Sequence, residues 1–247
     1  MTLLLNCDLG EIDDPALAVE RAVMPLIDLA NISCGHHAGE RSTIVGALGL
    51  ARDHGVRVGA HPGYPDRANF GRVSVPHTRD QLIALLRQQI AELQATAAAL
   101  DVHLHYVKPH GALYNDMMAS PDVRSAAMAA VASGDGPRRL MLLASAAAEE
   151  HRREGAALGI DILFEAFADR GYSDRGNLLP RGQPGAVLDH DRMLAQVAQL
   201  LDLGSVTTAG GKVIPLHADT LCVHGDTPGA VAAIKAIRAL LQPRGAG

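Results

Sequence analysis

The sequence predicts a β/α barrel that spans residues 1–247 as one domain. Its 247 residues are an ordinary length for a single barrel of this kind. Short apolar runs rich in Leu, Val and Ile alternate with longer stretches of helical period, which is typical of repeated βα units. Residues capable of acid-base or metal chemistry follow nearly every apolar run, and ligands bind at that end of parallel strands.

Seven apolar runs have the length and composition of buried strands. They are Leu3–Cys7, Ala30–Ser33, Val56–Ala60, His103–Val107, Leu140–Leu143, Asp161–Ala166 and Thr220–Val223.

Capping side chains mark four helix starts. Asp14, Ser120 and Thr227 each stand directly before a proline, which is favoured at the first helical position. Thr78 begins a capping box with the glutamine three residues later. Residues 167–188 are rich in Gly and Pro, and loops of that length inside compact domains are usually functional.

Composition indicates a globular protein that acts on small molecules. The chain is 48% hydrophobic, and its net charge of −5 is spread along its length, which gives no footprint for nucleic acid or an anionic membrane. The N-terminus lacks a basic region, and the longest apolar run, Leu140–Ala148, is about half the length of a bilayer span. We therefore expect a cytoplasmic protein. The three cysteines form no Cys-x-x-Cys pair and are expected to be reduced core residues.

Polar residues at the predicted strand ends are the strongest functional signal, because these ends meet at one rim of a barrel. They are Asn6, Asp8, Glu11, His36, His37, Glu40, His61, Lys108, His110, Glu165, Asp169, Arg170, His224 and Asp226.

Most of these residues also have a structural interpretation. Adjacent side chains on extended backbone point in opposite directions, so only one of His36 and His37 should face the centre. Asp8 and Asp226 could cap the segments that follow them. Lys108 is costly to bury alone, so either a carboxylate neutralises it or it meets an anionic substrate.

Other charged residues fit a surface role equally well. Four arginines in Gly-rich loops are either solvated or bind a carboxylate. These are Arg67, Arg72, Arg170 and Arg175. Four histidines away from the predicted rim are expected to be structural. These are His54, His77, His151 and His190.

Known catalytic motifs are absent from the sequence. The segment Thr208–Val213 ends in Gly-Lys but lacks the earlier glycine and the following Ser or Thr of a Walker A loop. Neither a Gly-x-Ser-x-Gly elbow nor a His-Glu-x-x-His helix occurs, which disfavours a serine hydrolase and a zincin.

Several blocks resemble the family of 5-oxoprolinase A subunits, also called the LamB/YcsF family, in the family's own order from Leu5 nearly to the final helix. The blocks are Asn6-x-Asp8-x-Gly10-Glu11, Ala30-Asn31-Ile32-x-Cys34-Gly35-x-His37-Ala38-Gly39, Gly59-Ala60-His61-Pro62, Pro65-Asp66-Arg67-x-Asn69-Phe70-Gly71-Arg72, Val107-Lys108-Pro109-His110-Gly111-Ala112-Leu113-Tyr114-Asn115, Phe167-Ala168-Asp169-Arg170-Gly171-Tyr172, Pro180-Arg181 and His224-Gly225-Asp226.

The resemblance implies a distorted seven-stranded TIM-like barrel similar to glycoside hydrolases and polysaccharide deacetylases. It also implies ATP-dependent opening of the lactam 5-oxo-L-proline to L-glutamate together with 5-oxoprolinase subunits B and C. Since no P-loop is present, ATP would be handled by, or shared with, these partners. The oligomeric state of the chain itself, a homo-oligomer included, stays open.

The expected site follows from these matches. The catalytic candidates, as bases or carbonyl-polarising groups, are Asp8, Lys108, His110 and Asp226. The candidates for a divalent metal are His37 and His61, with Asp8. The substrate-binding candidates are Asn6, Glu11, Asn31, Arg67, Arg72, Tyr114, Asn115, Glu165, Arg170 and His224.

The sequence departs from the family pattern in places, which bears on substrate identity more than on chemistry. The stretch after Glu11 is short and lacks the family's glycines, Glu40 stands where Asp is common, Tyr106 where His is common and Val73 where Arg is common. Two other functions stay open. One is a stand-alone metal-dependent deacetylase or amidohydrolase on the same barrel, and the other is a substrate-binding subunit without chemistry of its own.

Overall fold

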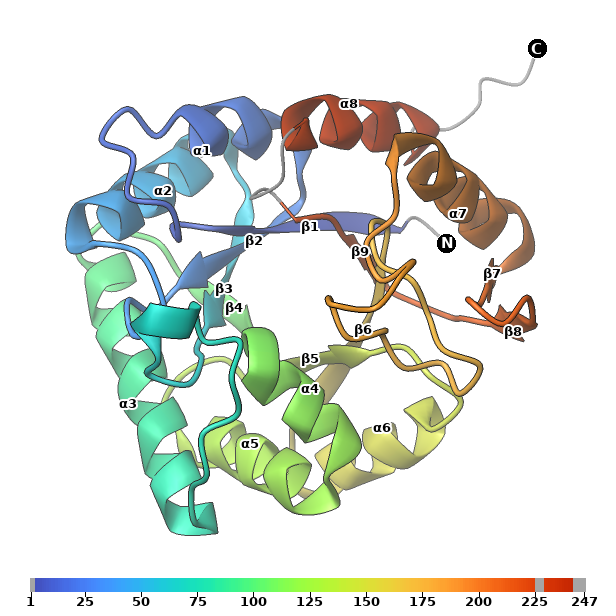
Figure 1. Cartoon of the computed structure of the whole chain (residues 1–247). Coiled ribbons are helices and arrows are strands. Elements are labelled where there is room, and N and C mark those ends of the chain that lie inside the picture. Colours follow the sequence, from blue (N-terminus) through green and yellow to red (C-terminus); the bar gives the residue numbers. More distant parts are fainter. Residues whose placement is uncertain (1–2, 225–228, 242–247) are drawn as a thin grey trace.

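The computed structural model describes residues 3–224 and 229–241, and it contains a closed barrel of seven parallel strands surrounded by helices (Figure 1). The barrel strands run in the order β1-β2-β3-β4-β5-β6-β9 before closing on β1. They are β1 (Leu4–Leu9), β2 (Leu29–Ser33), β3 (Arg57–His61), β4 (Leu104–Val107), β5 (Arg139–Leu143), β6 (Asp161–Phe167) and β9 (Thr220–Cys222). All seven predicted strands are confirmed, with ends displaced by at most two residues.

The barrel is irregular on one side, which is the distortion that the family resemblance implies. The register of β3 and β4 shifts between Val58 and Gly59. Strands β4 and β5 pair at a single position, Val107 opposite Leu140, whereas β5 and β6 pair along five positions. The chain after β4 stays bonded to the β3 side, where the Lys108 and His110 amides donate to the Ala60 and Pro62 carbonyls, before it enters α4.

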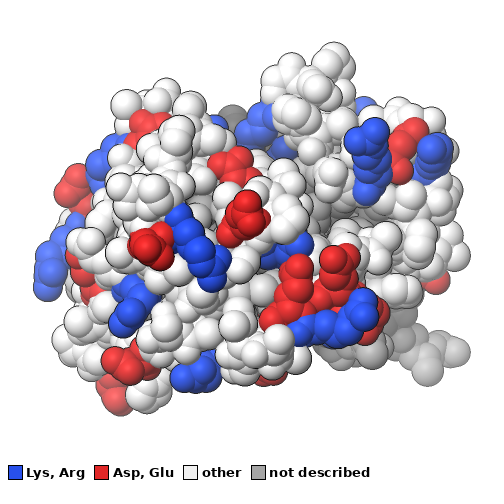
Figure 2. All heavy atoms as spheres, turned by 90° about the horizontal axis from the view of Figure 1, so that it is seen from below, with Lys and Arg blue, Asp and Glu red and all other residues white. Residues whose placement is uncertain are grey.

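Most of the helices form an outer ring around the barrel, and α4 lies inside that ring over the end of the barrel (Figure 1). The helices are α1 (Ala18–Val23), α2 (Arg41–His54), α3 (Arg79–Ala98), α4 (Gly111–Ala119), α5 (Pro121–Ser133), α6 (Ala148–Ala157), α7 (His190–Leu203) and α8 (Ala230–Leu241), with short 3-10 turns at Met24–Leu26 and Arg67–Asn69. Basic and acidic side chains are interspersed on the face of the molecule shown in Figure 2.

Two of the predicted helix starts are confirmed. Thr78 and Gln81 form the reciprocal capping box of α3, and the Ser120 side chain caps α5 with proline next in sequence. The prediction at Asp14 was wrong, because its carboxylate accepts from the Ala16 and Ala18 amides in a turn and α1 begins only after it. The fourth start, at Thr227, lies outside the described residues.

The long connection after β6 is fastened to the barrel. Two antiparallel bridges join Arg170 with Val187 and Tyr172 with Leu178. The Gln196 side chain of α7 donates to the carbonyls of Phe167, Ala168 and Arg170. The sequence did not predict the small hairpin between α7 and β9, formed by β7 (Ser205–Thr207) and β8 (Val213–Pro215).

The barrel interior has an apolar layer beneath a polar one. The apolar layer comprises Leu29, Tyr106 and Met141, with Leu4 and Leu163 packed against it. Tyr106 fits because Gly59 has no side chain: a Cβ on Gly59 would lie 2.2 Å from the tyrosine Cε2. The Tyr106 hydroxyl donates to Asn31 Oδ1 at 2.6 Å, which joins this layer to the polar one above.

The remaining expectations from composition can be placed on the fold. Cys7, Cys34 and Cys222 are buried free thiols, as predicted. None of the helices within the described ranges is long and apolar enough to cross a membrane.

Candidate active site

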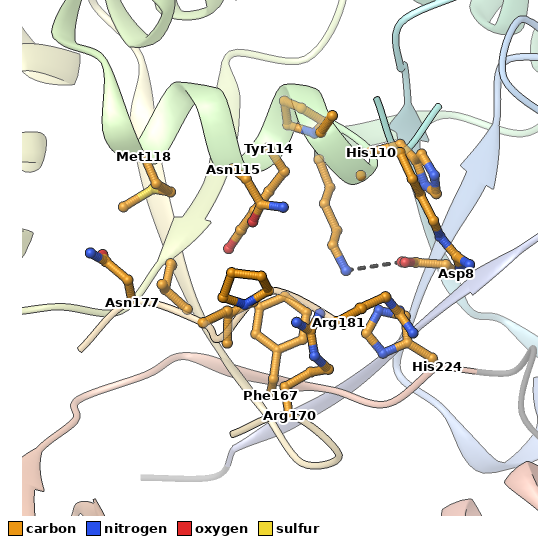
Figure 3. Close-up of a pocket in the computed structure, with 18 of the residues that line it drawn as sticks. Asp8, His110, Tyr114, Asn115, Met118, Phe167, Arg170, Asn177, Arg181 and His224 are labelled. Atoms are coloured by element: carbon orange, nitrogen blue, oxygen red, sulfur yellow. Dashed lines mark hydrogen bonds and ion pairs between the residues drawn. The ribbon is translucent and has the colours of Figure 1, made fainter. Parts of the chain in front are cut away.

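A cavity of about 470 Å³ opens at the carboxyl ends of the barrel strands. Helix α4 supplies one wall with Tyr114, Asn115 and Met118, and the connection after β6 supplies another with Asn177 and Arg181 (Figure 3). The volume falls in the range of roughly 300–1,000 Å³ found for small-molecule sites. The charged and polar residues that line the cavity are Asp8, Glu11, His61, Arg72, Lys108, His110, Tyr114, Asn115, Arg170, Asn177, Arg181 and His224.

Lys108 lies at the floor of the cavity among acceptors. Its Nζ lies 2.9 Å from Asp8 Oδ1, the contact dashed in Figure 3, and 3.1 Å from Glu165 Oε2. Burial alone would lower the pKa of Lys108, but Asp8 and Glu165 hold that pKa well above its usual value, so the ammonium stays charged. Of the two partners that the sequence left open for this lysine, the structure supplies the carboxylate.

Asn6, Asn31 and Glu165, which were expected to bind substrate, lie beneath the cavity instead. All three are fully buried and do not line it. Asn31 Nδ2 donates to Asp8 Oδ1 at 2.7 Å, and Asn6 Oδ1 accepts from Lys108 Nζ at 3.3 Å. Burial raises the pKa of Glu165 although Lys108 opposes the shift. These side chains point into the barrel, where they position Asp8 and Lys108; we call the group Asn6, Asn31, Lys108 and Glu165 the lysine network.

A second group at the floor consists of acceptor atoms that face one another. His61 Nε2 lies 2.9 Å from His110 Nδ1, 3.5 Å from Glu11 Oε1 and 3.4 Å from Asp8 Oδ2. His110 Nδ1 lies 3.0 Å from Glu11 Oε1. We call these four atoms, from Asp8, Glu11, His61 and His110, the acceptor cluster.

Backbone carbonyls fix the tautomers of the two histidines in this cluster. His61 Nδ1 lies 2.7 Å from the Lys108 carbonyl oxygen, and His110 Nε2 lies 2.9 Å from that of Phe70. A carbonyl oxygen only accepts, so these two ring nitrogens carry hydrogen. In the neutral rings, the nitrogens that face Glu11 therefore carry lone pairs. A proton or a cation is needed among the four acceptors.

The pKa values of this region reflect the same electrostatics. Burial would raise the pKa of the Asp8 carboxyl, but His61 and Lys108 outweigh it and hold this pKa well below its usual range. Burial would also lower the pKa of His61, but Asp8 reverses the effect and raises it. Glu11 is likewise held ionised, because His110 outweighs burial and lowers its pKa.

His37 is stacked on His110 and contacts Glu11. The two rings are nearly parallel, with centroids 3.9 Å apart and planes 9° apart, and His37 Nε2 lies 3.0 Å from Glu11 Oε1. Burial lowers the pKa of His37 to about 4, so the ring is neutral. Gly71 allows this stacking, because a Cβ there would lie 2.8 Å from the Cβ of His37. His37 thus belongs with Glu11 and not, as the sequence suggested, with Asp8.

Two neighbours on the outer side of this region lie away from the cavity. His36 points outward and pairs with Glu92 on α3 at 2.7 Å, so only His37 of the adjacent pair faces inward. Arg67, a predicted substrate ligand, donates to the carbonyls of Gly35 and Gly39 and does not line the cavity. The glycine-rich turn after β2 takes up its guanidinium.

His224 and Asp169 form a dyad on the β9 side of the cavity. His224 Nδ1 lies 2.8 Å from Asp169 Oδ2, which leaves Nε2 available to a bound molecule. Burial opposes ionisation of Asp169, but His224 lowers its pKa, so the carboxylate stays charged. A carboxylate that orients a histidine is the usual support for a proton-carrying imidazole. The sequence placed Asp169 at a strand end but gave it no role.

Two arginines give the cavity a positive end. Arg170 is buried and donates to the carbonyls of Ala186 and Leu179, and both burial and the charge of Arg181 lower its pKa. Within residues 3–224 and 229–241, Arg181 has no carboxylate partner. Arg72 stacks its guanidinium on Phe70 at 4.8 Å from the ring centre. Arg175 does not line the cavity.

The other predicted site residues can be placed as follows. Tyr114 and Asn115 line the cavity from α4, and burial together with Glu165 raises the pKa of the Tyr114 hydroxyl, which therefore keeps its proton. Asp226 lies outside the described residues. Sequence reasoning assigned no role to Arg181, although it stands in the Pro-Arg block that carries the family resemblance.

Comparisons with known proteins agree with this architecture. The model of the LamB/YcsF family matches residues 3–247. The chain is 45% identical over 242 residues to the 5-oxoprolinase A subunit of Vibrio cholerae, covering 97% of this chain and 98% of that one. It is 42% identical over 246 residues to the 5-oxoprolinase A subunit of Pseudomonas fluorescens, covering 99% and 98%. The solved structure of a lactam utilization protein from Thermus thermophilus superposes with a TM-score of 0.86 at 36% identity, covering 98% of this chain and 96% of that one.

Proposed function

The chain belongs to the LamB/YcsF family, and from this we propose that it is the lactam-hydrolysing component of an ATP-dependent 5-oxoprolinase that works with subunits B and C. The full-length likeness to the A subunits of 5-oxoprolinases carries the proposal, and the cavity supports it. The substrate is 5-oxo-L-proline and the product is L-glutamate. Because the reaction consumes ATP, the proposal assigns it to the cytoplasm.

The charges of the cavity suit a small anionic lactam. At the positive end, the Arg181 guanidinium is available to the substrate carboxylate, with buried Arg170 adding to the potential. Tyr114 keeps its proton and can donate a hydrogen bond from the α4 wall. The lactam ring then lies toward the floor, where Asp8, Lys108 and His224 meet.

Opening a lactam requires water to attack the carbonyl carbon, the C–N bond to break and the ring nitrogen to accept a proton. We assign the proton transfer to His224, because Asp169 holds its Nδ1 and leaves Nε2 on the cavity side. The charged Lys108 stabilises the negative charge that the carbonyl oxygen carries once ATP has phosphorylated it. In these assignments Asp8 holds Lys108 in place and does not take the proton itself.

ATP supplies activation in this proposal by phosphorylating the amide oxygen, which releases ADP. Attack by one water and cleavage of the C–N bond then give an acyl phosphate of glutamate, and a second water releases inorganic phosphate and glutamate. The partner subunits handle the nucleotide, because this chain has no Walker A motif. The Gly-Gly-Lys segment that superficially resembles one forms the turn between β7 and β8, not a loop between a strand and a helix.

The acceptor cluster favours a second candidate, a metal-dependent amidohydrolase that needs neither ATP nor partners. Two histidines and a carboxylate are a common donor set for catalytic metals. On this alternative the cavity would bind an amide, and activation would come from the cation.

A turnover assay distinguishes these functions. Release of glutamate from 5-oxo-L-proline is measured with the purified chain alone, with subunits B and C, and with or without ATP. We expect turnover only when the partners and ATP are all present. Efficient ATP-independent turnover by the chain alone supports the amidohydrolase. Equal turnover by subunits B and C with and without this chain contradicts the proposal. Binding without any turnover in the complete mixture indicates a subunit that only presents substrate.

A further inference from the structure

The acceptor cluster has no role in the proposed lactam chemistry, and its four atoms repel one another. The nitrogens and oxygens of His61, His110 and Glu11 face one another at 2.9, 3.0 and 3.5 Å, and Asp8 Oδ2 lies 3.4 Å from the same His61 nitrogen. All four groups are at most 8% exposed, so water screens their mutual repulsion only weakly. Burying facing lone pairs is costly unless something positive lies between them.

The hydrogen bonds on the far sides of the two histidine rings indicate a metal. Each of the two rings donates its other N–H to a backbone carbonyl, His61 to Lys108 and His110 to Phe70. This arrangement is the one found around metal-ligating histidines, where the outer hydrogen bond fixes the tautomer and orients the ring. Both rings are nine-tenths buried or more, and neither can turn without losing its carbonyl.

We propose that His61 Nε2, His110 Nδ1 and Glu11 Oε1 bind one divalent transition-metal cation of the zinc class. Donors 2.0–2.2 Å from a common ion lie about 3–3.5 Å from one another, which is the spacing of these three atoms. Two imidazoles and one carboxylate leave further coordination positions, and the cavity borders this side of the barrel. Asp8 Oδ2 adds negative charge next to the ion.

The geometry assigns His37 a different role. An imidazole binds a metal in the plane of its ring, and the rings of His37 and His110 are stacked 3.9 Å apart with planes only 9° apart. One ion cannot lie in both planes. His37 instead donates from Nε2 to Glu11 Oε1 and positions this carboxylate. It is a positioning residue and not a ligand.

Metal titration of the chelator-stripped protein tests the proposal without lactam, ATP or partner subunits, so its result is independent of the proposed function. Co²⁺ is the probe for absorption, because inner-sphere coordination produces visible bands, and Zn²⁺ is the probe for calorimetry. We expect one equivalent of each to bind. His61→Gln and His110→Gln should abolish the Co²⁺ bands. His37→Gln should keep the bands while binding roughly 10- to 100-fold more weakly, as expected for loss of an outer-shell partner.

His36→Gln is the matched control, because His36 is the neighbouring histidine and pairs with Glu92 outside the cavity. It should leave the bands and the affinity unchanged. Circular dichroism checks that each variant is folded; if one is not, the wild-type titration still decides. The proposal is wrong if the wild-type protein gives neither Co²⁺ bands nor a Zn²⁺ binding heat, or if the bands survive in folded His61→Gln and His110→Gln.

Discussion

Asp8 of the acceptor cluster also contacts the lysine network, and the charges of the two groups are matched in opposite ways. On one side, Asp8 Oδ1 accepts from Lys108 Nζ at 2.9 Å and from Asn31 Nδ2 at 2.7 Å, so a donor faces an acceptor at each contact. On the other side, Asp8 Oδ2 faces the His61 nitrogen whose lone pair is directed at Glu11 and His110. One carboxylate thus separates a region whose charges are already paired from one that needs a proton or a cation.

The contrast separates the buried polar residues that stabilise the fold from those that are available for chemistry. Groups whose hydrogen bonds are already matched contribute to stability. Removing one of them leaves its partner buried in a region of low dielectric without a hydrogen bond. Groups that keep an unmatched atom toward the cavity contribute to binding or proton transfer. Substitutions in each group test this division.

His224→Gln tests a residue that is available for chemistry. Because Nε2 of His224 is the proton carrier in our proposal, turnover by the complete enzyme should fall by roughly 10²- to 10⁴-fold. The free energy of unfolding should change little. His217→Gln, an exposed histidine outside the cavity, should retain full turnover. Undiminished turnover in His224→Gln would remove the dyad from the mechanism.

Lys108→Met tests whether the lysine network stabilises the fold. The change leaves the buried carboxyls of Asp8 and Glu165 without their cation, which should lower the free energy of unfolding by about 3–5 kcal/mol. Urea denaturation at neutral pH measures the loss. Lys235→Met on the exposed surface of α8 should stay within about 0.5 kcal/mol of the wild type. If Lys108→Met is equally stable, the network is not what holds the floor of the cavity.

The pH dependence of stability tests His37, which is stacked on His110 and contacts Glu11. Its pKa is about 4 in the folded protein, against about 6.5 when unfolded, so the unfolded state binds more protons between these values. Stability should therefore decrease as pH falls through this window, by up to about 1.4 kcal/mol per pH unit from this residue.

Urea denaturation at pH 5 and pH 7, in buffer with a chelator, measures that dependence. His37→Gln should flatten it, and His36→Gln should not, since His36 pairs with Glu92 at the surface. Equal slopes in the wild type and His37→Gln would show that the buried ring does not titrate as stated.

Arg181→Ala should have the smallest effect. The variant loses one charged hydrogen bond to the substrate carboxylate, so KM for 5-oxo-L-proline should rise about 10-fold and kcat should stay unchanged. The expected rise in KM is modest because the Arg181 side chain is only partly buried. Arg175→Ala, from the same connection but outside the cavity, is the control. A lower kcat at constant KM would show that Arg181 acts on the transition state and not on substrate binding.

The sequence predicted the barrel well because its signals are local and repeated. Apolar runs located all seven barrel strands. Only one of His36 and His37 faces the centre, as expected, although both lie in a bend after β2 and not on extended backbone. The short hairpin of β7 and β8 gave no such signal, because its strands have three residues each. Asp14 has the chemistry of a cap, but its carboxylate closes a turn instead.

The site was harder to predict because strand-end position does not reveal what a side chain contacts. Asn6 and Asp8 lie two residues apart on β1 and point to the same side, so depth is what separates them. Asn6, Asn31 and Glu165 are fully buried beneath the cavity, whereas Asp8 lines it. Arg67 was expected to bind substrate, but it donates to the carbonyls of Gly35 and Gly39. The sequence alone does not show where that turn lies. The stacking of His37 on His110 depends on Gly71, which is remote from both in the chain.

The apolar layer of Leu29, Tyr106 and Met141 has a kinetic consequence. It lies one layer nearer the amino ends of the strands than Asn31, and Tyr106 occupies the space left by Gly59. The cavity is therefore a blind chamber and not a tunnel. In the proposed reaction, glutamate has to leave by the opening through which the next lactam enters, so release and loading compete for one passage. A partner that docked over this rim would control both events with a single contact.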